Sequence, residues 1–223
     1  MNIAAILAGG VGSRMGGEIP KQFMEVDGVP IIVRTVEKFQ RHSQIDIICI
    51  VCISQHCQYM RELAEKYRLS KVQYILPGGR DRQESSFIAV KAMYDEYGPD
   101  DIILIHDGAR PNVTAGIISE NIRMASKVGA CNTVIPSQDT VLVSEDGETV
   151  SGYTDRRKIY LVQTPQSFLL KTIYDAHLEG KGRSGITDDC SLVILSGGKV
   201  GLVRGDKKNV KITTYEDLEW LRI

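Results

Sequence analysis

The chain has 223 residues, of which 43% are hydrophobic and 25% are charged, so it is long and apolar enough to bury its own core. The formal net charge of −1 excludes a global positive field, and we therefore expect no binding to nucleic acid or to an anionic membrane. The five cysteines are irregularly spaced, which predicts that the protein has no disulfide framework. The N-terminus lacks the basic segment of a signal peptide, and no apolar run reaches about 18 residues, so we expect a cytoplasmic protein.

Strand and helix patterns alternate along about the first 135 residues. Short apolar runs bounded by turn residues are typical of buried strands, and they occupy residues 3–8, 45–53, 72–76 and 102–105. Apolar residues at helical spacing predict helices over residues 31–39, 60–67, 87–94 and 117–125, the last of them capped by Thr114. This alternation predicts an α/β fold with a mostly parallel, Rossmann-like sheet whose two faces are covered by helices.

The pattern changes between residues 137 and 160. Two β segments, at 140–143 and 149–153, flank the turn Glu145-Asp146-Gly147, and an Asp-Gly turn between extended segments is a hairpin signal. A hairpin inserted into an α/β chain would project from the sheet as an arm. The remaining elements are expected in this order: a helix at 168–177, a strand at 191–195, a strand at 200–203 and a helix that begins at Tyr215.

A glycine-rich turn follows the first strand. Gly9, Gly10 and Gly12 let backbone amides approach an anion without interference from a Cβ atom. Arg14 adds a guanidinium and Lys21 adds an ammonium near the same strand end, where ligands of open α/β sheets bind. The segment matches neither the dinucleotide-binding GxGxxG pattern nor the Walker A pattern. We interpret it as a phosphate-binding loop, and the alternative is a flexible turn with solvated cations.

Five motifs, in order along the chain, resemble a known family. They are LAGGxGxRM with PKQ at residues 7–22, HDGARP at 106–111, TPQ at 164–166, TDD at 187–189 and NVKIT at 209–213. Together they resemble the polyol-phosphate cytidylyltransferases, which include 2-C-methyl-D-erythritol 4-phosphate cytidylyltransferase and ribitol-5-phosphate cytidylyltransferase. Because the set spans nearly the whole chain, the resemblance implies a single domain over residues 1–223 with a GT-A-like nucleotidyltransferase sheet.

The resemblance implies that CTP and a polyol phosphate react to give a CDP-polyol and pyrophosphate. Arg14, Lys21 and Lys211 would be catalytic, contacting the triphosphate and stabilising the charge that develops in the transition state. CTP would be bound by Leu7, Ala8, Gly9, Gly10, Gly12, Gly79, Arg82 and Ser85. Asp107 follows an apolar strand, where a carboxylate can hold Mg²⁺ or another divalent cation, and the alternative role for it is a turn cap. No general base is needed, because a phosphate monoester is largely dianionic near neutral pH.

The same resemblance assigns the acceptor to six residues: Arg110, Asp139, Thr140, Arg156, Thr164 and Thr187. In the family the hairpin arm crosses to a second subunit. Arg156 would then reach the neighbour's site, and a homodimer would be the catalytic unit. The alternative for the cationic run Arg156-Arg157-Lys158 is a solvated strand end.

The choice of acceptor depends on smaller similarities. The segments at 7–10 and 163–168 resemble the ribitol branch of the family, so D-ribitol 5-phosphate is the favoured acceptor. The alternative is 2-C-methyl-D-erythritol 4-phosphate, an intermediate of non-mevalonate isoprenoid synthesis. Two rival classes share parts of the pattern. They are the molybdopterin or hexose-1-phosphate nucleotidyltransferases and a non-catalytic nucleotide-binding regulatory domain.

Overall fold

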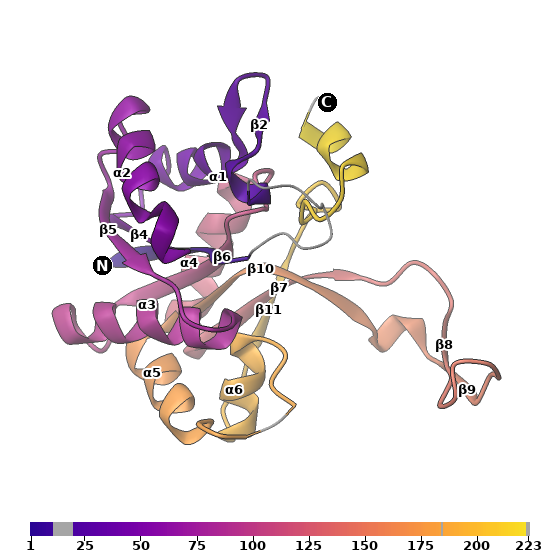
Figure 1. Cartoon of the computed structure of the whole chain (residues 1–223). Coiled ribbons are helices and arrows are strands. Elements are labelled where there is room, and N and C mark those ends of the chain that lie inside the picture. Colours follow the sequence, from indigo (N-terminus) through magenta and orange to yellow (C-terminus); the bar gives the residue numbers. More distant parts are fainter. Residues whose placement is uncertain (11–19, 184, 222–223) are drawn as a thin grey trace.

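The computed structural model describes residues 1–10, 20–183 and 185–221, which are organised around a central sheet (Figure 1). Its strands, in spatial order, are β11 (Gly201–Arg204), β7 (Ala130–Pro136), β10 (Tyr160–Leu169), β6 (Ile102–Asp107), β1 (Asn2–Ala8), β4 (Ile47–Cys52) and β5 (Val72–Pro77). All neighbouring strands are parallel except that β10 runs antiparallel to both β6 and β7. The predicted mostly parallel sheet is therefore confirmed within these ranges.

Helices cover both faces of the sheet, as the alternating pattern predicted (Figure 1). One face carries α1 (Ile31–Gln40), α2 (Cys57–Lys66) and α4 (Ala115–Val128), and the other carries α3 (Arg82–Glu96), α5 (Leu170–Glu179) and α6 (Asp189–Leu195). Phe39 and Ile118 belong to the core on the first face, and Val90 and Ile173 to the core on the second. Among the described residues, no helix has both the length and the apolar character needed to cross a membrane.

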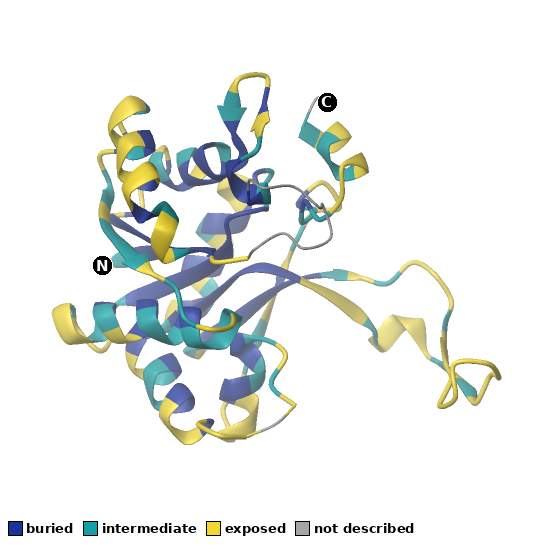
Figure 2. Cartoon of the chain, in the orientation of Figure 1, coloured by how far each residue is buried: buried dark blue, intermediate teal, exposed yellow. Residues whose placement is uncertain are grey.

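A long arm projects from one end of the sheet (Figure 1, right). Its tip is the antiparallel hairpin of β8 (Val141–Val143) and β9 (Gly152–Thr154), and the 3-10 helix η3 (Arg156–Lys158) leads back into β10. The strand β10 belongs to both regions, because residues 160–162 are exposed in the arm whereas residues 163–168 are buried in the sheet (Figure 2). The predicted hairpin is present at the predicted position.

The strands β7 and β10 were not predicted, and two predicted elements have a different form. Residues 189–195 form the helix α6 and not a strand, because Asp188 and Ser191 make a reciprocal capping box that starts a helix there. The C-terminal segment is the 3-10 helix η4 (Glu216–Leu221), with Asp217 accepting hydrogen bonds from the backbone just before it. Four short elements had no signal, since two or three residues carry no periodicity: η1 (Lys21–Phe23), β2 (Glu25–Val26), β3 (Val29–Pro30) and η2 (Ser54–His56).

Candidate active site

A pocket of about 310 Å³ lies at the carboxyl ends of β1 and β6. It lies between two glycine-rich turns, the first after β1 and the second at residues 78–81, just before α3. Seven of the predicted CTP-binding residues line it: Leu7, Ala8, Gly9, Gly10, Gly79, Arg82 and Ser85. Lys21, Asp107 and Lys211 line it as well, so the first, second and last motifs of the sequence converge on one cavity. Gly12 and Arg14, which were also predicted to act here, lie outside the described residues.

Asp107 is buried at the floor of this pocket among cations. Its Oδ2 lies 3.1 Å from Lys211 Nζ and 3.2 Å from Arg110 Nε, and its Oδ1 lies 3.7 Å from Arg82 Nε. Burial works to raise the pKa of Asp107, but the charges of Lys211, Arg82 and Arg110 outweigh it and hold that pKa well below its usual range. The carboxylate therefore stays ionised and fixes three cations near the place where a triphosphate would bind.

The first glycine-rich turn is tied to the segment that carries Lys21. Gln22 is 2% exposed, and its side-chain amide donates to the carbonyl oxygens of Ala8 at 2.5 Å and Gly10 at 2.8 Å. These bonds hold Lys21, the preceding residue, against the end of β1. Gln22 had appeared in the sequence only as part of the PKQ motif, and its role as this tie is visible only from the fold.

The second glycine-rich turn leads into α3. Asp81 caps the helix by accepting a hydrogen bond from the Glu84 backbone at 2.8 Å, and the Ser85 hydroxyl accepts from the Gly79 backbone at 3.1 Å. A Cβ atom at Gly79 would lie 2.3 Å from Glu84 Cγ, so only glycine fits there while Glu84 keeps this position. The helix start thus places Arg82 and Ser85 at the edge of the pocket.

Arg82 is held by a second buried carboxylate. Its Nη1 lies 2.7 Å from Asp189 Oδ2, and Asp189, which is 1% exposed, also accepts a 2.5 Å hydrogen bond from the Ser86 hydroxyl. Burial works to lower the pKa of Arg82, and the charges of Asp189 and Asp107 raise it well above its usual value. The sequence showed Asp189 only within the TDD motif and did not indicate this ion pair.

The residues beneath Asp107 form a buried hydrogen-bonded support. Thr164, 4% exposed, accepts from the Asp107 backbone at 3.1 Å, and its hydroxyl lies 3.0 Å from His106 Nδ1. The side-chain amide of Asn209 donates to the Thr164 backbone carbonyl at 2.9 Å, and the Asn209 backbone carbonyl accepts from Arg110 Nη1 at 2.8 Å. Burial lowers the pKa of His106 to about 4, so this imidazole is neutral near pH 7. Two predicted acceptor residues, Thr164 and Arg110, are thus part of the support for Asp107.

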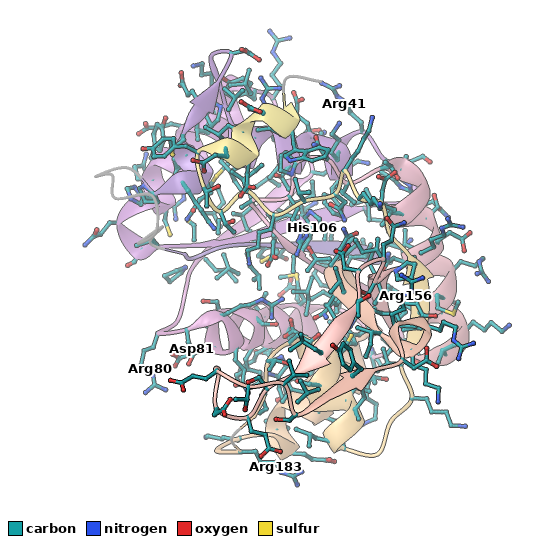
Figure 3. All side chains as sticks on the ribbon, turned by 90° about the vertical axis from the view of Figure 1, so that its right-hand side faces the viewer. Arg41, Arg80, Asp81, His106, Arg156 and Arg183 are labelled. Atoms are coloured by element: carbon teal, nitrogen blue, oxygen red, sulfur yellow. The ribbon has the colours of Figure 1, made fainter. Side chains whose placement is uncertain are left out.

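The other predicted acceptor residues lie elsewhere. Asp139, Thr140 and Arg156 are exposed on the arm, outside the described lining of the pocket, and Arg156 Nη1 donates to the Gln138 carbonyl at 3.0 Å. Figure 3 shows Arg156 well apart from Arg80 and Asp81, which mark the second glycine-rich turn. Thr187 lines an adjoining pocket of about 270 Å³ that shares Asp81 and Arg82 with the first. Among the described residues, one chain therefore brings together the predicted nucleotide residues but not the whole acceptor set.

The carboxylates of the pocket fit one mode of metal binding. Among the described residues, no group of three or more His, Cys, Asp or Glu side chains is placed to hold a metal ion. Mg²⁺ nevertheless often binds through one or two carboxylates together with substrate phosphates and water. Asp107, the ionised carboxylate at the pocket floor, fits that mode as the protein's contribution.

Comparisons with known proteins agree on one family. The sequence profile of IspD, 2-C-methyl-D-erythritol 4-phosphate cytidylyltransferase, matches residues 2–221. Ribitol-5-phosphate cytidylyltransferases of Vibrio parahaemolyticus and Streptococcus agalactiae are 37% and 36% identical, each over 97% of this chain and 92% of the relative. The crystal structure of 4-diphosphocytidyl-2C-methyl-D-erythritol synthase from Anaerococcus prevotii superposes with a TM-score of 0.85 at 29% identity, covering 100% of this chain and 96% of that one.

Proposed function

The chain belongs to the 2-C-methyl-D-erythritol 4-phosphate cytidylyltransferase family, and on that premise we propose that it transfers the cytidylyl group of CTP to D-ribitol 5-phosphate and releases pyrophosphate. That it is a cytidylyltransferase follows from the family. The ribitol acceptor is supported by the two relatives at 37% and 36% identity, both of which carry that substrate in their names. The ribitol-like segments at 7–10 and 163–168 support the same acceptor.

The second candidate acceptor is 2-C-methyl-D-erythritol 4-phosphate. It is favoured by the family profile and by the titles of the similar solved structures. Those structures share 29% and 27% identity with the chain, which is less than the named ribitol enzymes share. We therefore keep it as the alternative.

The single observation that carries the proposed mechanism is the ring of cations around Asp107. In the reaction, a phosphate oxygen of the acceptor forms a bond to the α-phosphorus of CTP, and the bond from that phosphorus to the bridging oxygen breaks. Pyrophosphate leaves with the electron pair of the broken bond. Lys21, Lys211 and Arg82 line the pocket and would offset the negative charge that develops on the leaving group, with Arg14 as a further candidate.

No side chain is required as a general base. The acceptor phosphate is largely dianionic near neutral pH, since its second pKa is about 6. His106, the imidazole nearest the pocket floor, is 0% exposed and bonded to Thr164 and to the Arg110 carbonyl. We assign it a positioning role beneath Asp107.

A divalent metal completes the proposed site. Members of the family generally depend on such a metal. When bound, it would neutralise phosphate charge and orient the triphosphate. Asp107 would hold it, and Lys211, which pairs with Asp107 in this structure, is then available to contact the α-phosphate.

We also propose that the arm forms a homodimer in which Arg156 enters the partner's acceptor site. The arm exposes a cluster of apolar side chains, among them Leu142, Val150, Tyr153 and Leu161. Exposed apolar surface of this kind is typical of an association surface. A cytoplasmic location is consistent with five cysteines that are all free thiols.

The test is pyrophosphate release from the full chain with CTP and Mg²⁺, using each of the two polyol phosphates in turn. We expect a higher kcat/KM with D-ribitol 5-phosphate. Preference for the methylerythritol phosphate would replace the proposed acceptor with the alternative. Preference for GTP over CTP would reject the cytidylyl assignment, and no turnover with any pair would favour a regulatory nucleotide-binding domain.

A further inference from the structure

A second and larger hollow, of about 480 Å³, lies beside α1 and α4. We call it the basic hollow and define it by Lys38, Arg41, Ala115, Asp206, Lys208 and Trp220. Within the described residues it shares no lining residue with the catalytic pocket. Figure 3 shows Arg41 on the opposite side of the molecule from Arg80 and Asp81. The hollow is therefore a separate site and not an extension of the catalytic pocket.

Positive charge reaches the hollow from two distant parts of the sequence. Lys38 and Arg41 come from the end of α1, whereas Lys208 comes from the segment after β11. Among the described lining residues, Asp206 is the one carboxylate opposing these three cations, and its Oδ1 accepts from the Lys208 backbone at 2.8 Å. Arg41 also pairs with Glu37 at 2.9 Å, but the Arg41 side chain is 75% exposed, and ion pairs that are open to solvent are weak. The hollow is net positive in a chain whose formal charge is −1.

Two further features suit a phosphate compound. The helix α4 begins at Ala115, which lines the hollow, and its first turn, fully described, contains no acidic side chain to offset the positive end of the helix dipole. Trp220, the chain's one tryptophan, is 42% exposed on the lining of the hollow. An indole that stays exposed beside cations can pack against a flat ring, such as a nucleobase.

The hollow is connected to the catalytic pocket through residues 206–211. The Asp206 carbonyl accepts from Gln163 Nε2 at 2.8 Å, next to the buried Thr164. Asn209 follows Lys208 and is fully buried, bonded to Thr164 and Arg110. Two residues later, Lys211 pairs with Asp107. A ligand that binds Lys208 and displaces it would therefore also displace the segment that follows. Hydrogen bonds limit the movement of this segment, which ends at Lys211, the proposed catalytic lysine.

We propose that the basic hollow is an effector site that binds an oligophosphate anion and thereby shifts Lys211. Two sources share this chemistry, free pyrophosphate and a nucleoside di- or triphosphate. Lys38 and Arg41 contact the anion from one side and Lys208 from the other, and the ring of a nucleotide packs on Trp220. The effect on turnover rests on the proposed role of Lys211, whereas binding at the hollow does not.

Binding is measured through Trp220 fluorescence in the full chain, because this one tryptophan lies in the hollow. Inorganic pyrophosphate and CDP are titrated separately, with excitation at wavelengths that cytosine does not absorb. We expect a saturable change with both probes, and tighter binding of CDP identifies a nucleotide as the source. The variant Arg41→Ala/Lys208→Ala should bind roughly tenfold more weakly, since two charged contacts are lost.

Two controls keep the binding test specific. The variant Ala115→Glu places a carboxylate in the hollow at a helix start that tolerates acidic residues, so it should weaken binding without unfolding the chain. The double variant Lys127→Ala/Lys181→Ala removes the same charge from exposed positions outside the hollow and should bind like the wild type. A saturable signal that disappears in Lys21→Ala and persists in Ala115→Glu would locate binding in the catalytic pocket and overturn the proposal.

The effector role is tested by inhibition kinetics. Pyrophosphate, as a product, should compete with CTP in every variant, but in the wild type it should also lower kcat through the hollow. In Ala115→Glu, pyrophosphate should still compete with CTP but should no longer lower kcat. An identical lowering of kcat in the wild type and in Ala115→Glu would overturn the effector role while leaving the cytidylyltransferase assignment intact.

Discussion

The floor of the catalytic pocket and the arm hold parts of one predicted site in opposite environments. Asp107 is buried on the floor and Asp189 is buried behind it, and each has several charged or hydrogen-bonding partners. On the arm, Tyr153 is 73% exposed, Leu161 is 54% exposed, and Arg156 lies at the surface.

This difference shows which half of the site one chain completes by itself. Buried charges are strongly unfavourable without partners, so the floor has to be assembled when the chain folds. Exposed apolar side chains instead gain stability when another surface covers them. We therefore expect changes on the floor to affect every chain by itself, and changes on the arm to act through the proposed second subunit.

The largest effect is expected on the floor. Replacing Lys211 by Ala removes a cation from the pocket, and kcat should fall by about 10²–10³-fold, as for the loss of one transition-state contact. Steady-state pyrophosphate release measures this change. Lys199→Ala, at an exposed position outside the pocket lining, is the control and should retain wild-type kcat. Equal activity of both variants would remove Lys211 from the mechanism.

A mixing experiment tests whether the arm acts through the partner. Arg156→Ala should raise the KM of the polyol phosphate by roughly tenfold, consistent with one lost charged contact, and should leave that of CTP nearly unchanged. Arg156→Ala and Lys211→Ala chains are then mixed in equal amounts and assayed with the polyol phosphate well below its wild-type KM, where both parents have low activity. Exchange of subunits should restore about a quarter of wild-type activity, because half of the dimers contain one intact site. If activity stays at the average of the two parents after exchange, Arg156 serves its own chain and the comparison between floor and arm fails.

A smaller effect is expected from the ion pair behind the pocket. Asp189→Asn leaves Arg82 without its closest carboxylate, so the free energy of unfolding should fall by about 1–3 kcal/mol and the KM of CTP should rise. Because the folded-state pKa of Asp189 lies below its usual value, its contribution is present above about pH 4 and is lost as pH falls further. Denaturant unfolding across this range measures the loss.

The matched control for this pair is Asp95→Asn. It removes the exposed ion pair with Lys91, and the free energy of unfolding should change by no more than about 0.5 kcal/mol. If the two substitutions lowered the free energy of unfolding equally, burial would not be the reason that the charged groups of the pocket are stable within one chain.

A further effect concerns pH and His106. Its pKa is lowered to about 4 in the folded state, so between about pH 6.5 and 4 the unfolded chain binds a proton that the folded chain excludes. Stability should therefore decrease as pH falls through this range, by up to about 1.4 kcal/mol per unit. His106→Gln should flatten that slope, measured by thermal unfolding at several pH values. An unchanged slope would assign the acid sensitivity to another group.

The sequence predicted the local features of the site better than its long-range pairs. The glycine-rich turns and Asp107 follow apolar strands directly, so local pattern and the edge rule for parallel sheets were enough to bring them together. The pairing of Arg82 with Asp189 joins positions 107 residues apart, and no periodicity reports such a contact. The TDD motif contains Asp189, but the sequence analysis gave that residue neither a role nor a partner.

The secondary structure was likewise predicted well where the local pattern is strong and poorly where it is weak. Fully apolar strands such as β1, β4 and β6 were evident because both of their faces are buried. The strand β10 was missed, since its polar residues Gln163, Gln166 and Ser167 are buried by hydrogen bonds and not by apolar packing. The helix α6 was mistaken for a strand because its short apolar run of 192–195 has no readable period.

The shared strand β10 also limits where this chain tolerates changes in length. The turn around Gly147 is exposed and makes only local bonds, so residues added or deleted there would alter the reach of the arm and little else. A single insertion between 163 and 168 would instead exchange the inward and outward side chains of a strand held on both sides by β6 and β7. We therefore expect length variation among descendants of this sequence to accumulate at the tip of the arm.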